Sequence, residues 1–274
     1  MSGPRLTTPT RIVGHLAPDL DCLVAIWILV RFGGAADASL EFVPAGRTLD
    51  GAPPDADPTI VHVDTGGGRF DHHHTSDPSL SAAELVRRAF APGDEALRRM
   101  VDQVTRIDNA EAGHGRYAGC FNITDLIAGY NALYPNKPCH VAQAMLPNLD
   151  AWYEHEQRSL RLERAFNRRL EFRTRWGLGI AMAGDDGGSS RLAYSHGAVL
   201  YAYRDRRGYM GVAAQRRSSV DLEPVYQDLK RVDAKADWYL HPSRRLLLCG
   251  TPKAPPRVPS ALSLEQLVDV LKRR

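Results

Sequence analysis

The stretch VDTGGGRFDHHHTSD, which begins at Val63, constrains the fold more than any other part of the chain. The apolar run 59–63 predicts a short buried strand of a parallel sheet, and Asp64 follows that strand directly. Seven residues later begins the run 71–74, which reads Asp-His-His-His. Carboxylates and imidazoles are ligands that divalent transition metals prefer. The stretch therefore predicts a sheet edge that carries a metal site.

Two other segments contain residues of the same kinds. The segment GHLAPDLDC follows a short apolar run, and a further aspartate follows Thr-Arg-Ile. Two imidazoles and four carboxylates match what a hydrolytic site with two ions, roughly 3.5–4 Å apart, requires. A single aspartate at a strand end can instead cap the following helix. The candidate metal ligands are His15, Asp19, Asp21, Asp64, His72 and Asp108.

Strand and helix patterns alternate along the first half of the chain, which predicts an α/β fold with a mainly parallel sheet flanked by helices. Ligands bind at the carboxyl ends of the strands in such sheets. The expected strands cover 11–15, 41–44 and 59–63, and the expected helices cover 20–32, 79–90 with Ser81 as N-cap, and 94–107 with Asp94 as N-cap.

Residues 122–175 are expected to be helical, and the charged stretch 149–175 either bridges two lobes or forms a surface helix. Beyond it, a smaller α+β domain is expected, with strands at 178–183, 198–204 and 209–214, a hairpin at 238–241 and 245–249, and helices at 220–232 and 263–274. The expected domains are 1–135 for metal binding, 136–176 as a helical linker and 177–274 for substrate binding.

The bulk composition is that of a globular protein, with 43% hydrophobic and 24% charged residues. The longest apolar run, 22–30, is too short to cross a bilayer, and the N-terminus lacks the apolar core of a secretory signal. The four cysteines form no CxxC pair, which argues against a zinc ribbon or a disulfide framework. We expect a cytoplasmic protein without a membrane partner, whose thiols are buried small hydrophobes.

The net charge of +3 conceals an asymmetry between the two halves of the chain. Residues 1–150 carry 18 acidic and 12 basic side chains, a net charge of −6, and residues 151–274 carry 14 acidic and 23 basic side chains, a net charge of +9. The acidic half suits cations, and the basic half suits a polyanion such as phosphate or nucleic acid. Solvated arginines on helix faces are the alternative explanation for the basic half.

Four motifs resemble those of the DHH phosphoesterase family. They are GHLAPDLDC, the aspartate that follows the strand at 59–63, the triplet Asp71-His72-His73, and Asp108 within Arg-Ile-Asp-Asn. The short gap before the triplet and the tail AKADWYLHPSRRLLLCGTPK resemble the branch of metal-dependent hydrolases related to the exonuclease named for the melanocyte-proliferating gene. The family's Gly-Gly-Gly-His signature is replaced here by Cys-Gly-Thr-Pro-Lys at 249–253.

The resemblance implies a role for each matching residue. His15 and Asp19 would bind one ion, Asp21 and His72 the other, and Asp64 and Asp108 would bridge them. His73 would contact or protonate the phosphate, with Asp71 orienting it. Together with Asp64, these two residues form the expected catalytic set. The expected cofactors are two divalent cations, manganese first, with magnesium or another divalent ion as the alternative.

Six residues are candidates for substrate binding, although each is also explained as a solvated side chain. Arginine binds phosphate through two parallel hydrogen bonds, and imidazoles near a metal site can contact substrate. The candidates are His74, His114, Arg216, Arg217, His241 and Lys253.

These patterns predict a metal-dependent phosphodiesterase or exonuclease that hydrolyses single-stranded nucleic acid or short oligonucleotides through water activated by two metals. A phosphatase of small nucleotides such as adenosine bisphosphate, or a pyrophosphatase, is the enzymatic alternative. A non-catalytic module that senses nucleotides or binds a partner is the second alternative. The sequence leaves open the cleavage polarity, RNA against DNA, the metal and the oligomeric state, for which a homodimer is one option.

Overall fold

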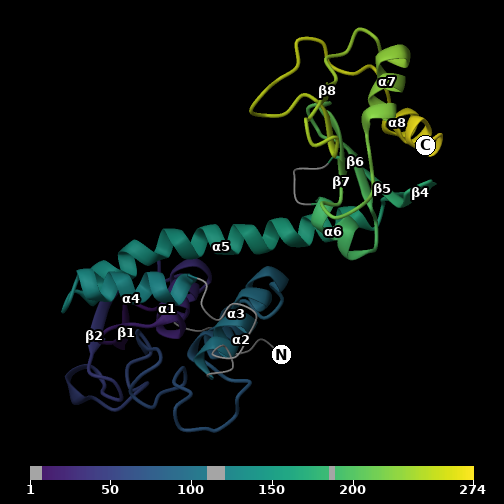
Figure 1. The fold of residues 1–274 in the computed structure, drawn as a ribbon. Coiled ribbons are helices and arrows are strands. Elements are labelled where there is room, and N and C mark those ends of the chain that lie inside the picture. The colour runs from purple at the N-terminus through teal and green to yellow at the C-terminus, as the bar shows by residue number, and fades with distance from the viewer. Residues whose placement is uncertain (1–7, 110–120, 185–188) are drawn as a thin grey trace. The chain divides into compact units, whose positions relative to one another are not determined.

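The computed structural model of the chain describes residues 8–109, 121–184 and 189–274. It contains two compact units, Met1–Gln157 and Arg158–Arg274 (Figure 1). The first unit holds a parallel sheet with helices and the second a mixed sheet with helices, which confirms the predicted α/β class. The division falls inside helix α5 (Pro138–Phe166), and the expected domain boundaries at 135 and 176 stay a prediction.

The sheet of the first unit has three parallel strands in the order β2-β1-β3. Strand β1 (Arg11–His15) lies in the middle, with β2 (Ser39–Val43) on one side and β3 (Ile60–His62) on the other. Ile12 and Val13 are fully buried although they point to opposite faces, as expected for a central parallel strand. A short 3₁₀ helix, η1 (Leu49–Gly51), precedes the proline-rich loop before β3.

Helix α1 (Leu20–Phe32) is the centre of the first hydrophobic core. Asp19 caps it by accepting a hydrogen bond from the Cys22 N–H, and the Gly33-Gly34 pair follows its last residue. Every residue from Leu20 to Leu29 is buried, because the sheet and other helices surround α1. These helices are α2 (Ala82–Phe90), α3 (Glu95–Asp108), α4 (Ile123–Leu133) and α5.

The N-caps of α2 and α3 are the predicted residues. The Ser81 side chain accepts from the Glu84 N–H, and the Asp94 side chain accepts from the Leu97 N–H. The Glu84 carboxylate binds Arg87 at 2.7 Å and Arg88 at 2.6 Å. This cluster holds a buried charge inside the first turns of α2.

Helix α5 differs from the prediction at both ends. It begins at Pro138 and ends at Phe166, so that residues expected to continue the helix to 175 form strand β4 (Leu170–Thr174) instead. Within the first unit, Asp150 on α5 accepts hydrogen bonds from the Trp27 indole at 2.8 Å and from Arg31 on α1. Among the described residues, no helix is long and apolar enough to cross a membrane.

The second unit contains, after β4, the elements β5 (Gly177–Ala183), α6 (Ser189–Ser195), β6 (Leu200–Arg204), β7 (Met210–Ala214), α7 (Glu223–Val232), β8 (Tyr239–Leu240), β9 (Leu246–Cys249) and α8 (Leu264–Lys272). Its six-stranded sheet has the order β4-β5-β6-β7-β9-β8, in which only β5 and β6 pair in parallel. Alternate residues of β5 and β6 face different helices: Ala181 and Ala202 face α7 and α8, whereas Ile180 and Tyr201 face α6.

Candidate metal centre

The ends of β1 and β3 bring the first two candidate ligands together. Val13 pairs with His62 across the two strands, and the Val63 N–H donates to the Val13 carbonyl at 2.9 Å. Two residues beyond this pair are His15, the last residue of β1, and Asp64, which follows β3. The His15 Nε2 atom lies 3.2 Å from the Asp64 Oδ2 atom.

The hydrogen bond of the His15 Nδ1 atom determines the tautomer of this imidazole. The Nδ1 atom lies 2.9 Å from the Leu16 carbonyl oxygen, which can only accept, so Nδ1 carries the proton. The Nε2 atom faces Asp64 and lies 3.8 Å from an oxygen of Asp19. In the neutral imidazole, this tautomer leaves the lone pair at Nε2, as a metal ligand requires.

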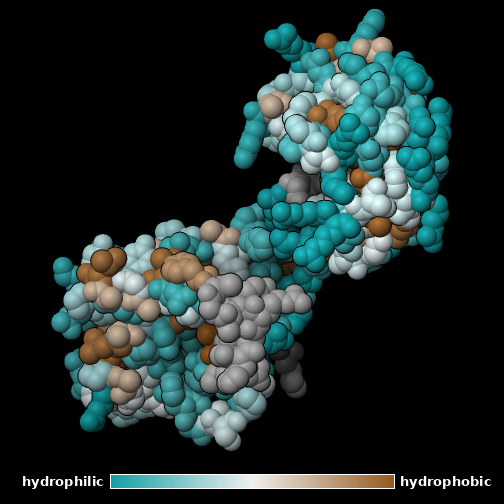
Figure 2. All heavy atoms as spheres, in the orientation of Figure 1, coloured by the Kyte–Doolittle hydropathy of each residue, from teal (hydrophilic) through white to brown (hydrophobic). Residues whose placement is uncertain are grey.

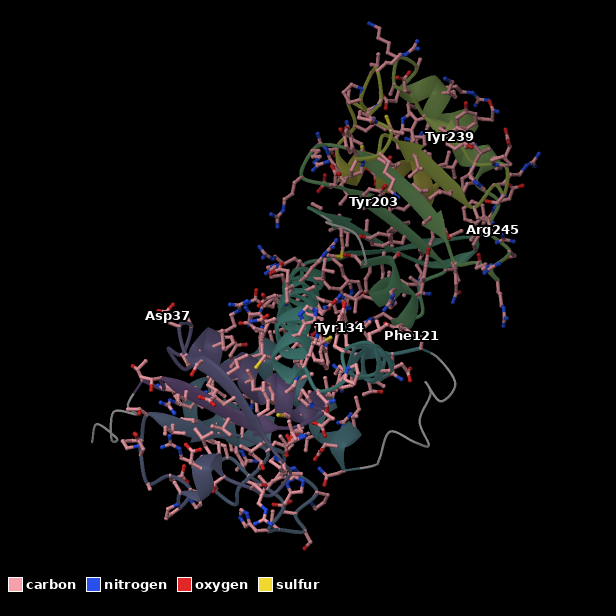
Figure 3. All side chains as sticks on the ribbon, turned by 90° about the vertical axis from the view of Figure 1, so that its left-hand side faces the viewer. Asp37, Phe121, Tyr134, Tyr203, Tyr239 and Arg245 are labelled. Atoms are coloured by element: carbon pink, nitrogen blue, oxygen red, sulfur yellow. The ribbon has the colours of Figure 1, made fainter. Side chains whose placement is uncertain are left out.

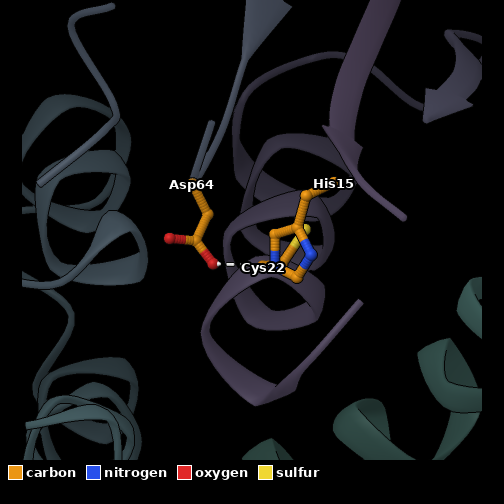
Figure 4. A group of neighbouring side chains, drawn as sticks. All are labelled: His15, Cys22 and Asp64. Atoms are coloured by element: carbon orange, nitrogen blue, oxygen red, sulfur yellow. Dashed lines mark hydrogen bonds and ion pairs between the residues drawn. The ribbon is translucent and has the colours of Figure 1, made fainter. Parts of the chain in front are cut away.

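Cys22, the last residue of the motif GHLAPDLDC, lies beside this pair. Its sulfur, an imidazole nitrogen of His15 and a carboxylate oxygen of Asp64 lie within 4.8 Å of one another (Figure 4). The sulfur can approach β1 closely because Gly14 has no side chain, and a Cβ there would lie 2.7 Å from it. Burial, and then the charge of Asp64, raise the pKa of the Cys22 thiol well above its ordinary value. Hard cations also prefer oxygen ligands to sulfur. We therefore regard Cys22 as a residue of the hydrophobic core and not as a metal ligand.

Three distant segments converge on His72. Its Nε2 atom lies 3.6 Å from Asp21, 3.5 Å from Asp64 and 3.3 Å from Asp108, the last residue of α3. All these distances join the imidazole nitrogen to carboxylate oxygens. The structure thus brings five of the six candidate ligands into one cluster, and Asp19 borders it through His15.

Asp21 has a second set of partners that the sequence did not reveal. The side chain is almost fully buried, and it accepts hydrogen bonds from the N–H groups of Ala82 at 2.6 Å and Ala83 at 2.9 Å. These N–H groups belong to the first turn of α2, where the helix itself offers them no acceptor. Burial, and then the charge of Asp64, raise the pKa of Asp21 to about 8.

Asp64 occupies the left-handed backbone region, with φ at 57°. Non-glycine residues in this region store strain, and they cluster at functional sites. Only 3% of the residue is exposed. Among the residues that the structure describes, three buried side-chain atoms have no hydrogen-bond partner: Asp64 Oδ1 and His72 Nε2 in the cluster, and His62 Nδ1 on β3. Buried polar atoms of this kind are rare in folded proteins, and coordination of an ion is one physical reason for them.

Asp71 holds the neighbouring His73 in place. Its carboxylate accepts from the Gly67 N–H at 2.7 Å, the His73 N–H at 3.1 Å and the His73 Nδ1 at 2.8 Å. Burial opposes ionisation, but these hydrogen bonds outweigh it and keep the pKa of Asp71 below its ordinary value. Because Nδ1 donates to Asp71, the Nε2 atom of His73 is the one offered to a ligand. The side chain of His73 is 66% exposed.

The imidazoles balance the charge of the carboxylates. The adjacent carboxylate of Asp64, together with the charges of Asp21 and Asp108, outweighs burial and raises the pKa of His72 to about 9. Burial disfavours a charged His15, but Asp19 and Asp64 outweigh it and raise the pKa of His15 to about 10. Burial also raises the pKa of Asp108. The cluster therefore attracts positive charge, either as protons or as cations.

The substrate-binding candidates have simpler surroundings. His74 is exposed beside the cluster, and His114 lies outside the described residues. In the second unit, the exposed His241 contacts the Ser243 hydroxyl at 2.8 Å. The labelled Tyr203 and Tyr239 belong to the same unit, whose visible face is mostly hydrophilic (Figures 2 and 3). The remaining candidates are exposed in turns, and they are Arg216, Arg217 and Lys253.

The cysteines follow the prediction in part. Cys22 and Cys249 are buried, as expected of small hydrophobes. Cys139 is exposed instead, because it lies in the first turn of α5, where its thiol donates to the Leu40 carbonyl at 3.3 Å. Cys120 lies outside the described residues.

A cavity of about 310 Å³ borders the cluster. It lies among the start of α1, the end of α3 and α4, and it includes Asp19, Asp21 and Asp108 in its wall. Leu20 precedes Asp21 and could have been inferred from its position in the first motif. The α4 residues in the wall, such as Asn131, carry no sequence signal that links them to the site.

No protein-family model matches the chain, and no curated protein matches it. Among solved structures, RecJ from Thermus thermophilus in complex with Mg²⁺ is similar at 15% identity with a TM-score of 0.33, and the match covers 98% of this chain and 50% of that one. The chain thus spans half the length of RecJ. An uncharacterized protein from Helicobacter pylori is similar at 11% identity with a TM-score of 0.26, covering 96% and 98% of the two chains.

The DHH domain of a protein assigned to a family of ribosomal proteins is also similar, at 11% identity with a TM-score of 0.29, covering 85% of this chain and 80% of that one. At TM-scores this low, the likenesses identify neither the activity nor the substrate of the present chain.

Proposed function

We propose that the chain is a phosphoesterase of the DHH type that depends on divalent metal ions. The buried Oδ1 atom of Asp64 and the buried Nε2 atom of His72, which lie 3.5 Å apart and make no hydrogen bond, are the observation that carries this proposal. Leaving a buried polar atom without a hydrogen bond costs roughly 1–3 kcal/mol. A cation between them would remove that cost.

The donors fit two cations. One set consists of Asp21, His72 and Asp108, whose ligand atoms lie within 4.8 Å of one another. A second set consists of His15 and Asp64, whose Nε2 and Oδ2 atoms lie 3.2 Å apart. The mixture of carboxylates and imidazoles suits manganese first and magnesium second.

The residues of the chain would share the work of phosphate-ester hydrolysis. Bound divalent cations supply Lewis-acid polarisation and neutralise charge on the phosphoryl oxygens. Asp71 fixes the orientation of His73, so that the imidazole can hold a proton at Nε2 and deliver it to the leaving oxygen. The buried carboxylates of Asp21 and Asp64 position the reacting phosphate by holding the cations.

We further propose that the substrate is single-stranded nucleic acid or a short oligonucleotide, and that residues 177–274 form a substrate-binding domain. The net charge of +9 in the second half of the chain supports this choice. A phosphatase of small nucleotides is the second candidate, and it is favoured by the small size of the cavity beside Asp21. A purely non-catalytic module is a weaker candidate, because carboxylate and imidazole donors for two cations lie in one cluster.

The test compares the wild type with Asp64→Asn and with a control, Asp37→Asn, which alters an exposed aspartate (labelled in Figure 3). Metal analysis should find about two divalent ions per chain in the wild type and the control. End-labelled oligonucleotides, adenosine bisphosphate and pyrophosphate should then be incubated with each protein and Mn²⁺. Loss of oligonucleotide cleavage in Asp64→Asn alone supports the proposal. No bound metal and no hydrolysis of any substrate would reject it.

A further inference from the structure

The cavity beside the cluster has an apolar side and a polar side. Its apolar side consists of Leu20 on α1, Val104 and Ile107 on α3, and Ile127 and Ala128 on α4. The volume of about 310 Å³ is at the lower end of the range for small-molecule sites. A cavity of this kind holds one ring system, and it has no room for a chain of several nucleotides.

The cavity lies on one flank of the cluster only. Its wall includes Asp21 and Asp108, which contact His72, but it includes neither Asp64 nor His73. A phosphate placed over the cluster would therefore have the cavity on the Asp21 flank and the His73 imidazole on the Asp64 flank. One substituent of this phosphate would therefore lie in the cavity. The other, the leaving group that His73 protonates, would lie on the opposite side of the phosphate.

Two polar side chains in the wall could orient a ligand. Asn131 donates its Nδ2 hydrogen to the Pro18 carbonyl at 3.1 Å, which leaves its amide oxygen as an acceptor. Thr124 donates its hydroxyl hydrogen to Asn122 at 2.6 Å, so its oxygen is also an acceptor. An apolar wall with a few polar groups is the usual composition of a pocket for a planar heterocycle. Acceptors of this kind suit the ring N–H and amino groups of a nucleobase.

We infer that this cavity binds the base of the nucleotide whose phosphate lies over the metal cluster, so that the substrate class is nucleoside phosphates and not pyrophosphate or sugar phosphates. This inference rests on the proposed function, which places a phosphate at the cluster. On an oligonucleotide, the cavity takes a single terminal base. The first unit thereby recognises its substrate through a base as well as through a phosphate.

Calorimetric titration of the full chain with adenosine 5′-monophosphate and with ribose 5-phosphate, both in Mn²⁺, tests the inference. The two ligands share the phosphate and the sugar and differ in the base. The nucleotide should bind about 10- to 100-fold more tightly, the range expected for burying one ring. Equal affinities would overturn the inference.

Two variants of α4 make the test specific. Ala128→Trp fills the cavity and should abolish the advantage of the nucleotide over the sugar phosphate, and the smaller Ala128→Leu should reduce it. Ala132→Trp adds the same bulk one turn later on α4, at an exposed residue outside the cavity wall, and should leave the advantage unchanged. Thermal melts confirm that each variant is folded. An unchanged advantage in both Ala128 variants would overturn the inference.

Adenosine without phosphate separates this inference from the proposed function. If adenosine binds in a way that Ala128→Trp abolishes while the chain binds no metal, the cavity assignment holds and the phosphoesterase proposal fails. If the chain hydrolyses oligonucleotides with Mn²⁺ but does not distinguish the nucleotide from ribose 5-phosphate, the phosphoesterase proposal holds and the cavity assignment fails.

Discussion

The carboxylate of Asp21 accepts the N–H of Ala82 at 2.6 Å, across 61 residues of sequence. The same carboxylate contacts His72 within the candidate metal centre. The start of α2 is therefore joined to the start of α1 through a residue that also belongs to the cluster. Asp21 has a structural role that holds whether or not a cation is bound.

Replacing Asp21 with alanine should destabilise the metal-free protein. The N–H groups of Ala82 and Ala83 would lose their acceptor in a buried place, and we expect a loss of about 2–4 kcal/mol in the free energy of unfolding. Urea unfolding in the presence of a chelator measures this loss. The exposed Asp37→Ala is the matched control, and equal stability of the two variants would contradict the prediction.

Manganese should stabilise the wild-type protein and not Asp64→Asn. A ligand that binds only the folded state adds about 2.7 kcal/mol when its concentration is 100 times its Kd. Asparagine tolerates the left-handed backbone of Asp64, so the metal-free variant should be as stable as the wild type. Thermal melts with Mn²⁺ and with chelator give both quantities. A metal-induced rise in the Tm of Asp64→Asn equal to that of the wild type would show that Asp64 does not bind the ion.

Asp150→Ala should weaken the attachment of α5 to α1. The Trp27 indole N–H, whose residue is 1% exposed, would lose its acceptor, and Arg31 would lose its ion pair. We expect a loss of about 1–3 kcal/mol in stability. Asp102→Ala removes a half-exposed ion pair to Arg98, and it should cost about 0–1 kcal/mol in the same unfolding assay. An equal loss in both variants would contradict the role of Asp150 as the acceptor for the buried Trp27 indole.

Protonation of Glu84 at acid pH should lower the free energy of unfolding. Burial alone would raise its pKa, but Arg87 and Arg88 outweigh burial and hold the pKa below its ordinary value of 4.5. A carboxyl group whose pKa is lower in the folded state stabilises the protein above its ordinary pKa, and this stabilisation is lost as the pH falls through the folded pKa. Unfolding measured between pH 7 and pH 3 should show a smaller loss in Glu84→Gln than in the wild type. Parallel curves would exclude this residue as a source of the acid sensitivity.

The sequence predicts the local features of this fold well. Strand β1 and helix α1 have the expected bounds, because Asp19 and Gly33 mark the ends of α1 and an apolar run marks β1. The end of α5 was predicted wrongly. Residues 167–175 are charged and lack proline, which favours a helix locally, but Phe172 is buried in the core of the second unit as part of a strand. Pairing with β5 therefore outweighs the local preference.

For the candidate site, the sequence indicated which residues lie close together, but it did not indicate all of their contacts. Residue type and spacing identified the residues that converge on His72, and the family resemblance implied that Asp71 orients His73. The contact of Asp21 with α2 and the approach of Cys22 to His15 depend on how helices pack, so no local pattern indicates them. The cavity wall on α4 depends on packing in the same way.

His15 is the last residue of β1, and Asp64 follows the end of β3 by two residues. The two strands pair directly, at the interstrand distance of about 4.8 Å that is common to all sheets, and this pairing brings the two side chains within reach of each other. Insertions into the long connection between these strands would leave this pair of donors in place. The closeness of this imidazole and this carboxylate thus follows from the pairing of β1 with β3, and the segments that connect the strands are free to diverge without altering it.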